Sequence, residues 1–240
     1  MSVLSVAGSC VVGAVTGAAS RPVVFARSVP APMHSRRNCP HCGNDILSSR
    51  GFRALPSSGR CPTCSARIGP PAGSVELMAA AAFTAIALGG ANGWLAAAQY
   101  WFAACGVALA VIDLAVQRLP DVLTVPACAG TLLLLTGATL AGEPGGLGRA
   151  AAAAAAVTAA FLVLSLPSGM GLGDVKLAPA VGALLGWSSW QKVLWGTVAG
   201  FFAGLVFAGA LLAAGRNRRV QVAFGPFMII GALAMSVTTG

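Results

Sequence analysis

Eight long apolar segments, each about the length needed to cross a lipid bilayer, occupy most of this chain. A transmembrane helix needs about 20 consecutive, predominantly apolar residues. Segments of this kind are found at residues 2–20, 75–91, 94–112, 122–141, 150–166, 175–189, 193–214 and 222–239. Only 9% of the 240 residues are charged, whereas soluble domains carry about 25%. The sequence therefore predicts an all-α polytopic membrane protein, with about eight transmembrane helices in contact with a lipid bilayer.

One segment, residues 21–74, differs sharply in composition from the rest of the chain. It is rich in Arg, Ser, Pro and Cys and contains no apolar run of span length. The predicted organisation is a first transmembrane helix at 1–20, a soluble module at 21–74 and a membrane-embedded domain of about seven helices at 75–240. A cleaved signal peptide is the alternative for the first segment, with a small-residue cleavage site at Gly17 to Ala19. No basic residue precedes this apolar run, which favours the transmembrane helix.

The basic residues are concentrated on one side of the predicted membrane topology. If the module is cytoplasmic, thirteen of the fifteen Lys and Arg residues lie in cytoplasmic segments, and only Arg149 and Lys192 lie on the other side. Such an excess is typical of cytoplasmic loops. The thirteen are Arg21, Arg27, Arg36, Arg37, Arg50, Arg53, Arg60, Arg67, Arg118, Lys176, Arg216, Arg218 and Arg219. We therefore expect a multi-pass protein of the inner or plasma membrane with a cytoplasmic module, and no nucleic acid partner for the net charge of +9.

Four cysteines in the module are spaced like the ligands of a zinc site. Cys39, Cys42, Cys61 and Cys64 form the pattern C-x2-C-x18-C-x2-C. Each C-x2-C turn directs two sulfur atoms at one point, and two such turns complete a tetrahedron around Zn²⁺. Gly43 suits the tight turn that follows the first pair. Two disulfides or a redox C-x-x-C are the alternatives, but stable disulfides are rare in the cytoplasm and the two pairs are matched. We therefore predict a structural zinc site.

The chain has only six acidic residues, and two of them lie at the edges of apolar segments. The six are Asp45, Glu76, Asp113, Asp121, Glu143 and Asp174. In the predicted topology Asp113 and Asp174 reach the same edge of the membrane, and an acidic residue at such a position is a functional-site candidate by default. Two carboxylates brought together share a proton, so one can act as a base on water and the other as an acid toward a peptide carbonyl. Gly171 and Gly173 leave room beside Asp174 for close backbone approach.

Four motifs follow one another along the membrane-embedded domain. They are Val111-Ile-Asp113-Leu, Leu119-Pro120-Asp121-Val-Leu-Thr124-Val-Pro126, Gly171-Leu-Gly173-Asp174-Val-Lys176-Leu177 and Phe224-Gly225-Pro226-Phe227. In this order they closely resemble the type IV prepilin peptidases. The paired C-x-x-C module ahead of a second span that contains Glu76 resembles the long, bifunctional form of that family. The resemblance covers nearly the whole chain.

The resemblance implies a specific activity. Members of the family cut the leader from prepilins and pseudopilins at the cytoplasmic face, after a glycine. The long forms also methylate the new N-terminal residue with S-adenosylmethionine. Carried over by position, the catalytic residues are Asp113 and Asp174, which implies an aspartyl endopeptidase with prepilin or pseudopilin substrates.

Other motif residues are expected to support the catalytic loops. Gly171 and Gly173 precede the second aspartate, and Asp121 and Lys176 match positions of the family motifs. For Asp121 we favour the N-cap of the fourth span. Lys176 has two interpretations, which are electrostatic tuning of Asp174 and extension of its charged end to the membrane interface.

Two segments depart from the family pattern. Residues 17–27 replace the usual Gly-Ser-Phe-Leu-Asn and basic stretch, and residues 53–56 replace an Asn-Ile-Pro-like segment between the cysteine pairs. Both segments are tied to methylation and to the seating of the module, so the resemblance supports cleavage more broadly than methylation. No methyl-donor site can be assigned from the residues.

A proton-coupled transporter is the alternative function, with Asp113 and Asp174 as a proton relay. Transporters of this kind commonly contain internal repeats with matched broken spans. No repeats align convincingly in this sequence. The peptidase is therefore the favoured interpretation.

Overall fold

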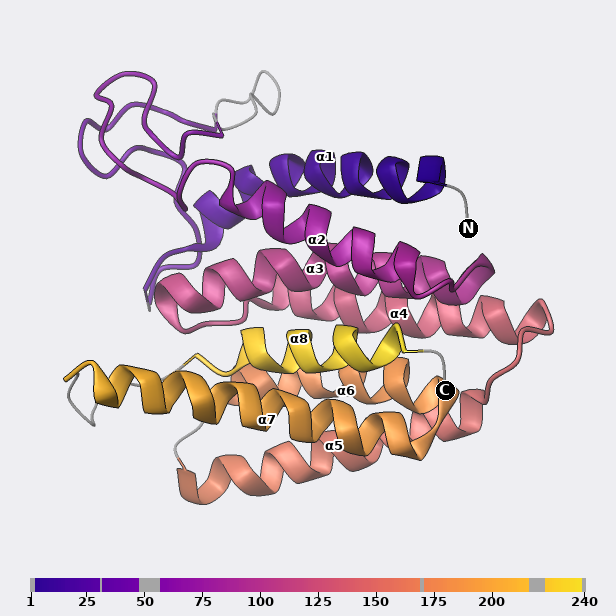
Figure 1. Ribbon diagram of the computed structural model, residues 1–240. Helices are drawn as coiled ribbons and strands as arrows, with labels where there is room; N and C mark the ends of the chain where they lie inside the picture. Colours follow the sequence, from indigo (N-terminus) through magenta and orange to yellow (C-terminus); the bar gives the residue numbers. More distant parts are fainter. Residues whose placement is uncertain (1–2, 31, 48–56, 169–170, 216–222, 239–240) are drawn as a thin grey trace.

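Eight α-helices form one bundle in the computed structural model, which describes residues 3–30, 32–47, 57–168, 171–215 and 223–238. Successive helices run in opposite directions, with the cysteine-containing module at one end of the bundle (Figure 1). The helices are α1 (Val3–Arg27), α2 (Ser74–Leu88), α3 (Gly93–Val116), α4 (Asp121–Leu140), α5 (Leu147–Ser168), α6 (Leu172–Ser188), α7 (Trp190–Ala213) and α8 (Gly225–Ser236). The described residues contain no β-strand beyond two isolated bridges, so the all-α prediction is confirmed.

The helices differ in burial, with some at the centre of the bundle and others at its periphery. In α3, 67% of the most apolar stretch is buried inside the protein, whereas the share is 11% in α1, 22% in α5 and 17% in α7. Most of α6 and α8 is also buried. α6 packs mainly against α4, α5 and α8, and α8 packs mainly against α3, α6 and α7. Because the outer helices expose apolar side chains over most of their length, they require an apolar solvent. This is the arrangement of a multi-pass membrane protein.

Five of the eight helices are long and apolar enough to cross a membrane, namely α1, α3, α4, α5 and α7. Of the remaining three, α2 and α8 are shorter than the segments that the sequence predicts, whereas α6 is slightly longer. They have 15 residues in α2, 17 in α6 and 12 in α8. A helix rises about 1.5 Å per residue, so α8 is only about 18 Å long. A helix that is surrounded by other helices does not have to match the thickness of the hydrocarbon, which explains why apolar composition overestimates the length of α8.

The first helix continues beyond the predicted end of the first span. The sequence suggests a break at Arg21 and Pro22, but α1 runs on to Arg27 with Pro22 inside it. Arg21 is 1% exposed rather than part of a loop. Its guanidinium donates to both carboxylate oxygens of Glu76 in α2, at 2.6 and 2.7 Å. The ion pair with Glu76 compensates the buried charge of Arg21, which the sequence alone places in a solvent-exposed loop.

Glycines allow α1 and α2 to pack in backbone contact. A Cβ atom at Gly13 would lie 2.7 Å from the backbone oxygen of Ala79, and one at Gly17 would lie 2.7 Å from that of Val75. Small residues at helix contacts are a common means of association in lipid. The close pair fixes the position of the module, because the module is the connection between these two helices.

The module consists of two similar turns with a small apolar core. Buried Cys39, Cys61, Ile46 and Ile68 pack against Phe25 from the last turns of α1. Core size is limited in such a short segment, which is the usual reason for a metal in small domains. The replacement segment at residues 53–56 lies outside the described residues.

Candidate active site and metal centre

The four cysteines predicted as metal ligands lie together. Their sulfur atoms are all within 4.8 Å of one another, and the Cys39–Cys64 and Cys42–Cys61 Sγ separations are both 3.8 Å. Zinc–thiolate bonds of about 2.3 Å in a regular tetrahedron place the sulfur atoms about 3.8 Å apart. The donor set and its spacing therefore fit a tetrahedral zinc ion.

The two cysteine turns have the same backbone geometry. Gly43 and Ser65 each follow the second cysteine of a pair, and both have positive φ, at 70° and 58°. The sequence predicts the tight turn at Gly43 but not the matching one at Ser65. A hydrogen bond from the backbone of Cys64 lowers the pKa of the Cys61 thiol to about 6. Backbone N–H groups directed at sulfur favour the thiolate, which is the form that binds metal.

Asp113 lies in the last turns of α3 and is buried, with 5% of its surface exposed. Its Oδ2 accepts a hydrogen bond of 3.1 Å from the backbone N–H of Gly225, the first residue of α8. A Cβ atom at Gly225 would lie 2.8 Å from the same Oδ2. The glycine is therefore required for the carboxylate to approach the helix N-terminus this closely. Gln117 ends α3 in the left-handed conformation with φ 52° and turns the chain toward α4.

Asp174 lies in the first turn of α6 and is also buried, with 7% exposed. Gly171 is the N-cap of this helix. Gly173 faces Leu119, and a Cβ atom there would lie 3.1 Å from the Leu119 Cβ. The glycine thus lets the start of α6 pack closely against the connection between α3 and α4. Residues 169 and 170, which directly precede this motif, lie outside the described residues.

Asp113 and Asp174 line the same cavity, which has a volume of about 770 Å³ and lies at the end of the bundle nearest the module. Both residues are more than nine-tenths buried, and neither forms an ion pair with another described residue. The cavity is lined by Arg27, His34, Asp113, Gln117, Arg118, Leu119, Pro120, Asp121, Val122, Gly171, Leu172, Gly173, Asp174, Lys176, Ala223 and Phe224. The two buried carboxylates from different helices are therefore accessible to one substrate.

Lys176 and Asp121 pair with each other at the edge of this cavity. The Lys176 Nζ lies 2.6 Å from the Asp121 Oδ1, and the side chains are 51% and 64% exposed. Lys176 thus has a direct partner other than Asp174. The predicted N-cap role of Asp121 is wrong, because Pro120 is the N-cap and Asp121 is the first helical residue. The carboxylate points to Lys176 on α6 instead of capping its own helix.

Several residues of this site were not identified from the sequence. The sequence indicates only loop charge at Arg118, but this residue lines the cavity and donates to the backbone oxygen of Met33 at 3.0 Å. His34 and Arg27 reach the cavity from the module side. Gly225 belongs to a motif to which no role was assigned. The sequence feature that points to Gly225 is a glycine directly before a proline at the start of an apolar run.

Together, the fold and the site define a polytopic helical membrane protein with two buried carboxylates at one end and a four-cysteine cluster in the module at the same end. The Type IV leader peptidase family matches residues 100–214, which include Asp113 and Asp174 but not the four clustered cysteines. The chain is 35% identical over 209 residues to a prepilin leader peptidase/N-methyltransferase of Aeromonas hydrophila, a match that covers 82% of this chain and 70% of that protein.

Two further relatives have the same name. The identity is 35% over 213 residues for the Burkholderia pseudomallei (strain 1026b) protein, covering 83% of this chain and 66% of the relative. It is 28% over 202 residues for the Pseudomonas aeruginosa protein, covering 80% and 68%. No solved structure gives a significant match. The chain belongs to the type IV leader peptidase family, and the resemblance seen in four motifs is confirmed.

Proposed function

We propose that this protein is a membrane aspartyl endopeptidase that removes the leader peptide from type IV prepilins or pseudopilins, with Asp113 and Asp174 as its catalytic pair. The observation that supports this most strongly is the common cavity. Two buried carboxylates, contributed by the end of α3 and the start of α6, line it together. Membership in the leader peptidase family favours this reaction over proton-coupled transport.

The pair can hydrolyse a peptide bond by general acid–base catalysis. Like charges close together do not both ionise, so one carboxylate keeps a proton. The ionised partner takes a proton from water, whose oxygen bonds to the carbonyl carbon. The protonated partner gives its proton to the carbonyl oxygen. The carboxyl group that took the proton from water gives it to the leaving nitrogen as the C–N bond breaks. The other carboxylate takes a proton from a hydroxyl group of the intermediate, which forms the new carboxyl terminus and restores the pair.

Gly225 is proposed to position the reacting carboxylate. Its backbone N–H holds Asp113 Oδ2 at the N-terminus of α8, which leaves the second oxygen of the carboxylate for water or substrate. Phe224 anchors this helix start against Phe161 and Phe201, with ring centroids 5.9 and 4.8 Å away. Catalytic groups must be held within a fraction of an ångström, and packed aromatic rings provide such rigidity.

The cavity is proposed to face the cytoplasm. Of the ten Lys and Arg residues that the structure describes, only Arg149 and Lys192 lie at the opposite end of the bundle. This bias follows the usual rule for inner-membrane proteins. We also propose that the module lies on the same side of the membrane as the active site and precedes a membrane-embedded domain at 75–240. The helix before the module extends past the predicted boundary at residue 20 to Arg27.

Cys39, Cys42, Cys61 and Cys64 are proposed to hold a structural Zn²⁺. Four thiolates fill a tetrahedral shell and leave no open position for substrate. The ion would stabilise the module rather than take part in catalysis. We further propose that the protein methylates the new N-terminus with S-adenosylmethionine, as the names of its relatives suggest. We assign no residues to the methyl donor.

Co-expression with a tagged prepilin, followed by intact-mass analysis, tests this function. The expected product has lost the mass of its leader and gained one methyl group. Loss of the leader without gain of the methyl group would support the proposed peptidase activity and exclude the proposed methyltransferase activity. An unprocessed prepilin, in the presence of correctly inserted enzyme, would contradict the proposal.

A further inference from the structure

A second cavity, of about 620 Å³, lies between the module and the ends of α1, α2 and α3. It shares no residue with the cavity that contains Asp113 and Asp174. Nothing in the peptidase reaction uses it. Its lining divides into two chemically different halves, which indicates the kind of molecule that it fits.

One half of this cavity is apolar and belongs to the membrane helices. Val111, Leu114 and Val116 line it from the last turns of α3, and Met78 lines it from the second turn of α2. Leu114 is 54% exposed and Met78 is 38% exposed, although both are on helices of the bundle. These side chains lie at the same end of α3 as Asp113. Apolar side chains exposed at this level are expected to contact lipid chains rather than water.

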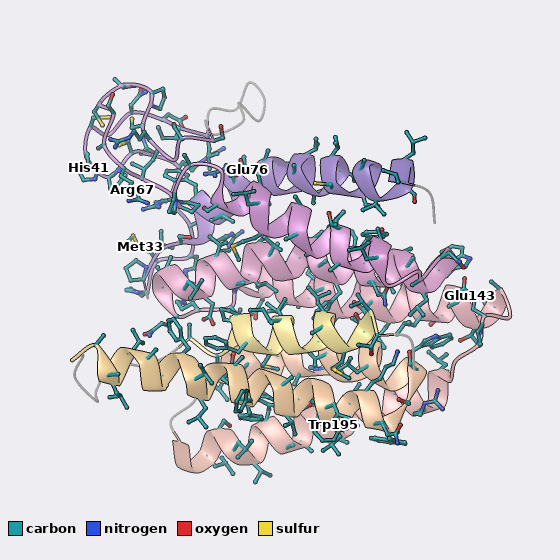
Figure 2. The ribbon with its side chains drawn as sticks, viewed as in Figure 1. Met33, His41, Arg67, Glu76, Glu143 and Trp195 are labelled. Atoms are coloured by element: carbon teal, nitrogen blue, oxygen red, sulfur yellow. The ribbon has the colours of Figure 1, made fainter. Side chains whose placement is uncertain are left out.

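The other half is cationic and belongs to the module. Arg36 and Arg67 both line it, and none of the described lining residues is acidic. In Figure 2, Arg67 and His41 lie at the edge of the module nearest the helix ends. Two positive charges without an acidic partner attract an anion.

The two arginines are held differently. The Arg36 guanidinium donates to the backbone oxygens of Phe25 and Ile68, each at 2.9 Å, and lies 4.5 Å from the centre of the Phe25 ring. It is therefore fixed, and burial lowers its pKa because the charged form is desolvated. Arg67 is exposed and has no hydrogen bond or ion pair to any described residue. Arg36 is thus a fixed cation in the wall, whereas Arg67 is free to close over a ligand.

We propose that this cavity binds one anionic phospholipid from the membrane leaflet on the module side. The acyl chains would contact Met78, Leu114 and Val116, and the phosphate would lie between Arg36 and Arg67. The polar layer of a bilayer adds about 5–7 Å to each side of the hydrocarbon, so a phosphate just beyond the last turn of a spanning helix is at its normal depth. Basic pockets beside transmembrane helices bind anionic headgroups for this reason.

Native mass spectrometry of the full-length, zinc-loaded protein in detergent tests the proposal. Dioleoylphosphatidylglycerol is titrated against dioleoylphosphatidylcholine, and the first bound lipid is quantified. The unmodified protein is expected to bind one phosphatidylglycerol in preference to phosphatidylcholine. Arg67→Gln is expected to weaken this binding about fivefold, which is the loss for one basic side chain near an anionic lipid. Arg67→Lys keeps the charge and is expected to retain most of the preference.

Arg60→Gln is the matched control. Arg60 is an exposed arginine of the same module, but its guanidinium donates to the backbone oxygen of Ser65 and it does not line the cavity. Equal weakening of phosphatidylglycerol binding in both glutamine variants would show that the effect comes from general surface charge, and would overturn the proposed site. Equal binding of the two lipids would also overturn it.

Two competitors distinguish the lipid from smaller ligands. Inorganic phosphate at millimolar concentration is expected to leave the first phosphatidylglycerol bound, because the apolar half of the cavity does not hold free phosphate. Displacement by phosphate would contradict a lipid site. Displacement by S-adenosylmethionine would assign the cavity to the methyl donor and overturn the proposal.

Discussion

The two ends of the bundle use their charged residues in opposite ways. At the end away from the module, every charged residue that the structure describes binds the backbone at a helix end. Glu143 accepts from the N–H groups of Trp94 and Leu95 at the start of α3, at 2.6 and 3.0 Å. In Figure 2, Glu143 lies at the end of the bundle opposite His41 and Arg67.

The two cations at this end bind carbonyl groups. Arg149 donates to the backbone oxygens of Gly186, Trp187 and Ser188, which end α6. Lys192 donates to the oxygen of Thr238, just beyond α8, at 2.6 Å. Acidic groups at helix starts and basic groups at helix ends also suit the helix dipole. These charges stabilise the fold.

At the module end many of the charged residues instead line open cavities. Asp113 and Asp174 are buried without an ion-pair partner among the described residues. Arginines line both cavities there. Buried charge without compensation lowers stability, so it is retained where function requires it. We therefore expect variants that disturb the buried carboxylates at the module end to change chemistry, while variants at the other end change stability.

The largest effect outside the two aspartates is expected for Gly225→Ala. The added Cβ would lie 2.8 Å from Asp113 Oδ2 and must displace the carboxylate. A catalytic group misplaced by about 1 Å costs about a hundredfold in rate, and we expect a loss of that size in leader cleavage. Gly209→Ala on α7 is the matched control, because a Cβ there meets nothing within 4 Å. Similar cleavage rates for the two variants would exclude the positioning role of Gly225.

A double variant, Cys39→Ser/Cys61→Ser, separates the module from the carboxylates. It is expected to lose about one zinc per chain, and the module should become sensitive to protease, since folding and metal binding are coupled. Leaders are still removed, with a smaller loss of rate than in Gly225→Ala, but the product carries little added methyl mass. Elemental analysis, limited proteolysis and intact mass give these readouts. Equal loss of cleavage and methylation would show that the module is also needed for cleavage.

At the opposite end, Arg149→Ala removes the donor for three carbonyl groups of α6. We expect it to lower the free energy of unfolding by about 1.5–3 kcal/mol, the range for hydrogen bonds to a charged group. Cleavage per folded molecule should stay unchanged. Thermal unfolding in detergent and a cleavage assay on the same sample give both values. A large loss of cleavage without a loss of stability would break the division between the two ends.

The smallest effect is expected for Asp121→Asn. Its ion pair with Lys176 is more than half exposed on both sides, so it contributes less than about 1 kcal/mol. Leader cleavage should remain close to that of the unmodified protein. A severe loss of cleavage in the inserted variant would mean that Asp121 takes part in the reaction.

Much of the fold follows from the sequence because membrane insertion depends on local composition. The eight apolar segments match eight helices, and the four cysteines meet because their spacing already defines two turns. The sequence also predicts that Asp113 and Asp174 reach the same edge, since helices alternate in direction. The structure places both in one cavity.

The remaining features depend on contacts between distant segments. The Gly225–Asp113 hydrogen bond joins residues 112 positions apart. The burial of Arg21 requires Glu76, which lies 55 positions later. The local sequence suggests a loop position for Arg21 and a helix cap for Asp121. It misleads because the partners of these residues, Glu76 and Lys176, are distant in the sequence. Packing of the bundle supplies those partners.

Leader cleavage by Asp174→Asn tests the central claim most directly. The substitution keeps the size of the side chain and removes its acid–base chemistry. The variant is co-expressed with a tagged prepilin, its insertion is verified by membrane fractionation, and the product is weighed by intact-mass analysis. The account predicts that the prepilin keeps its full leader, and that adding Asp113→Asn lowers cleavage no further, because residues that act as a unit are not additive. Appreciable loss of the leader by correctly inserted Asp174→Asn protein would contradict it.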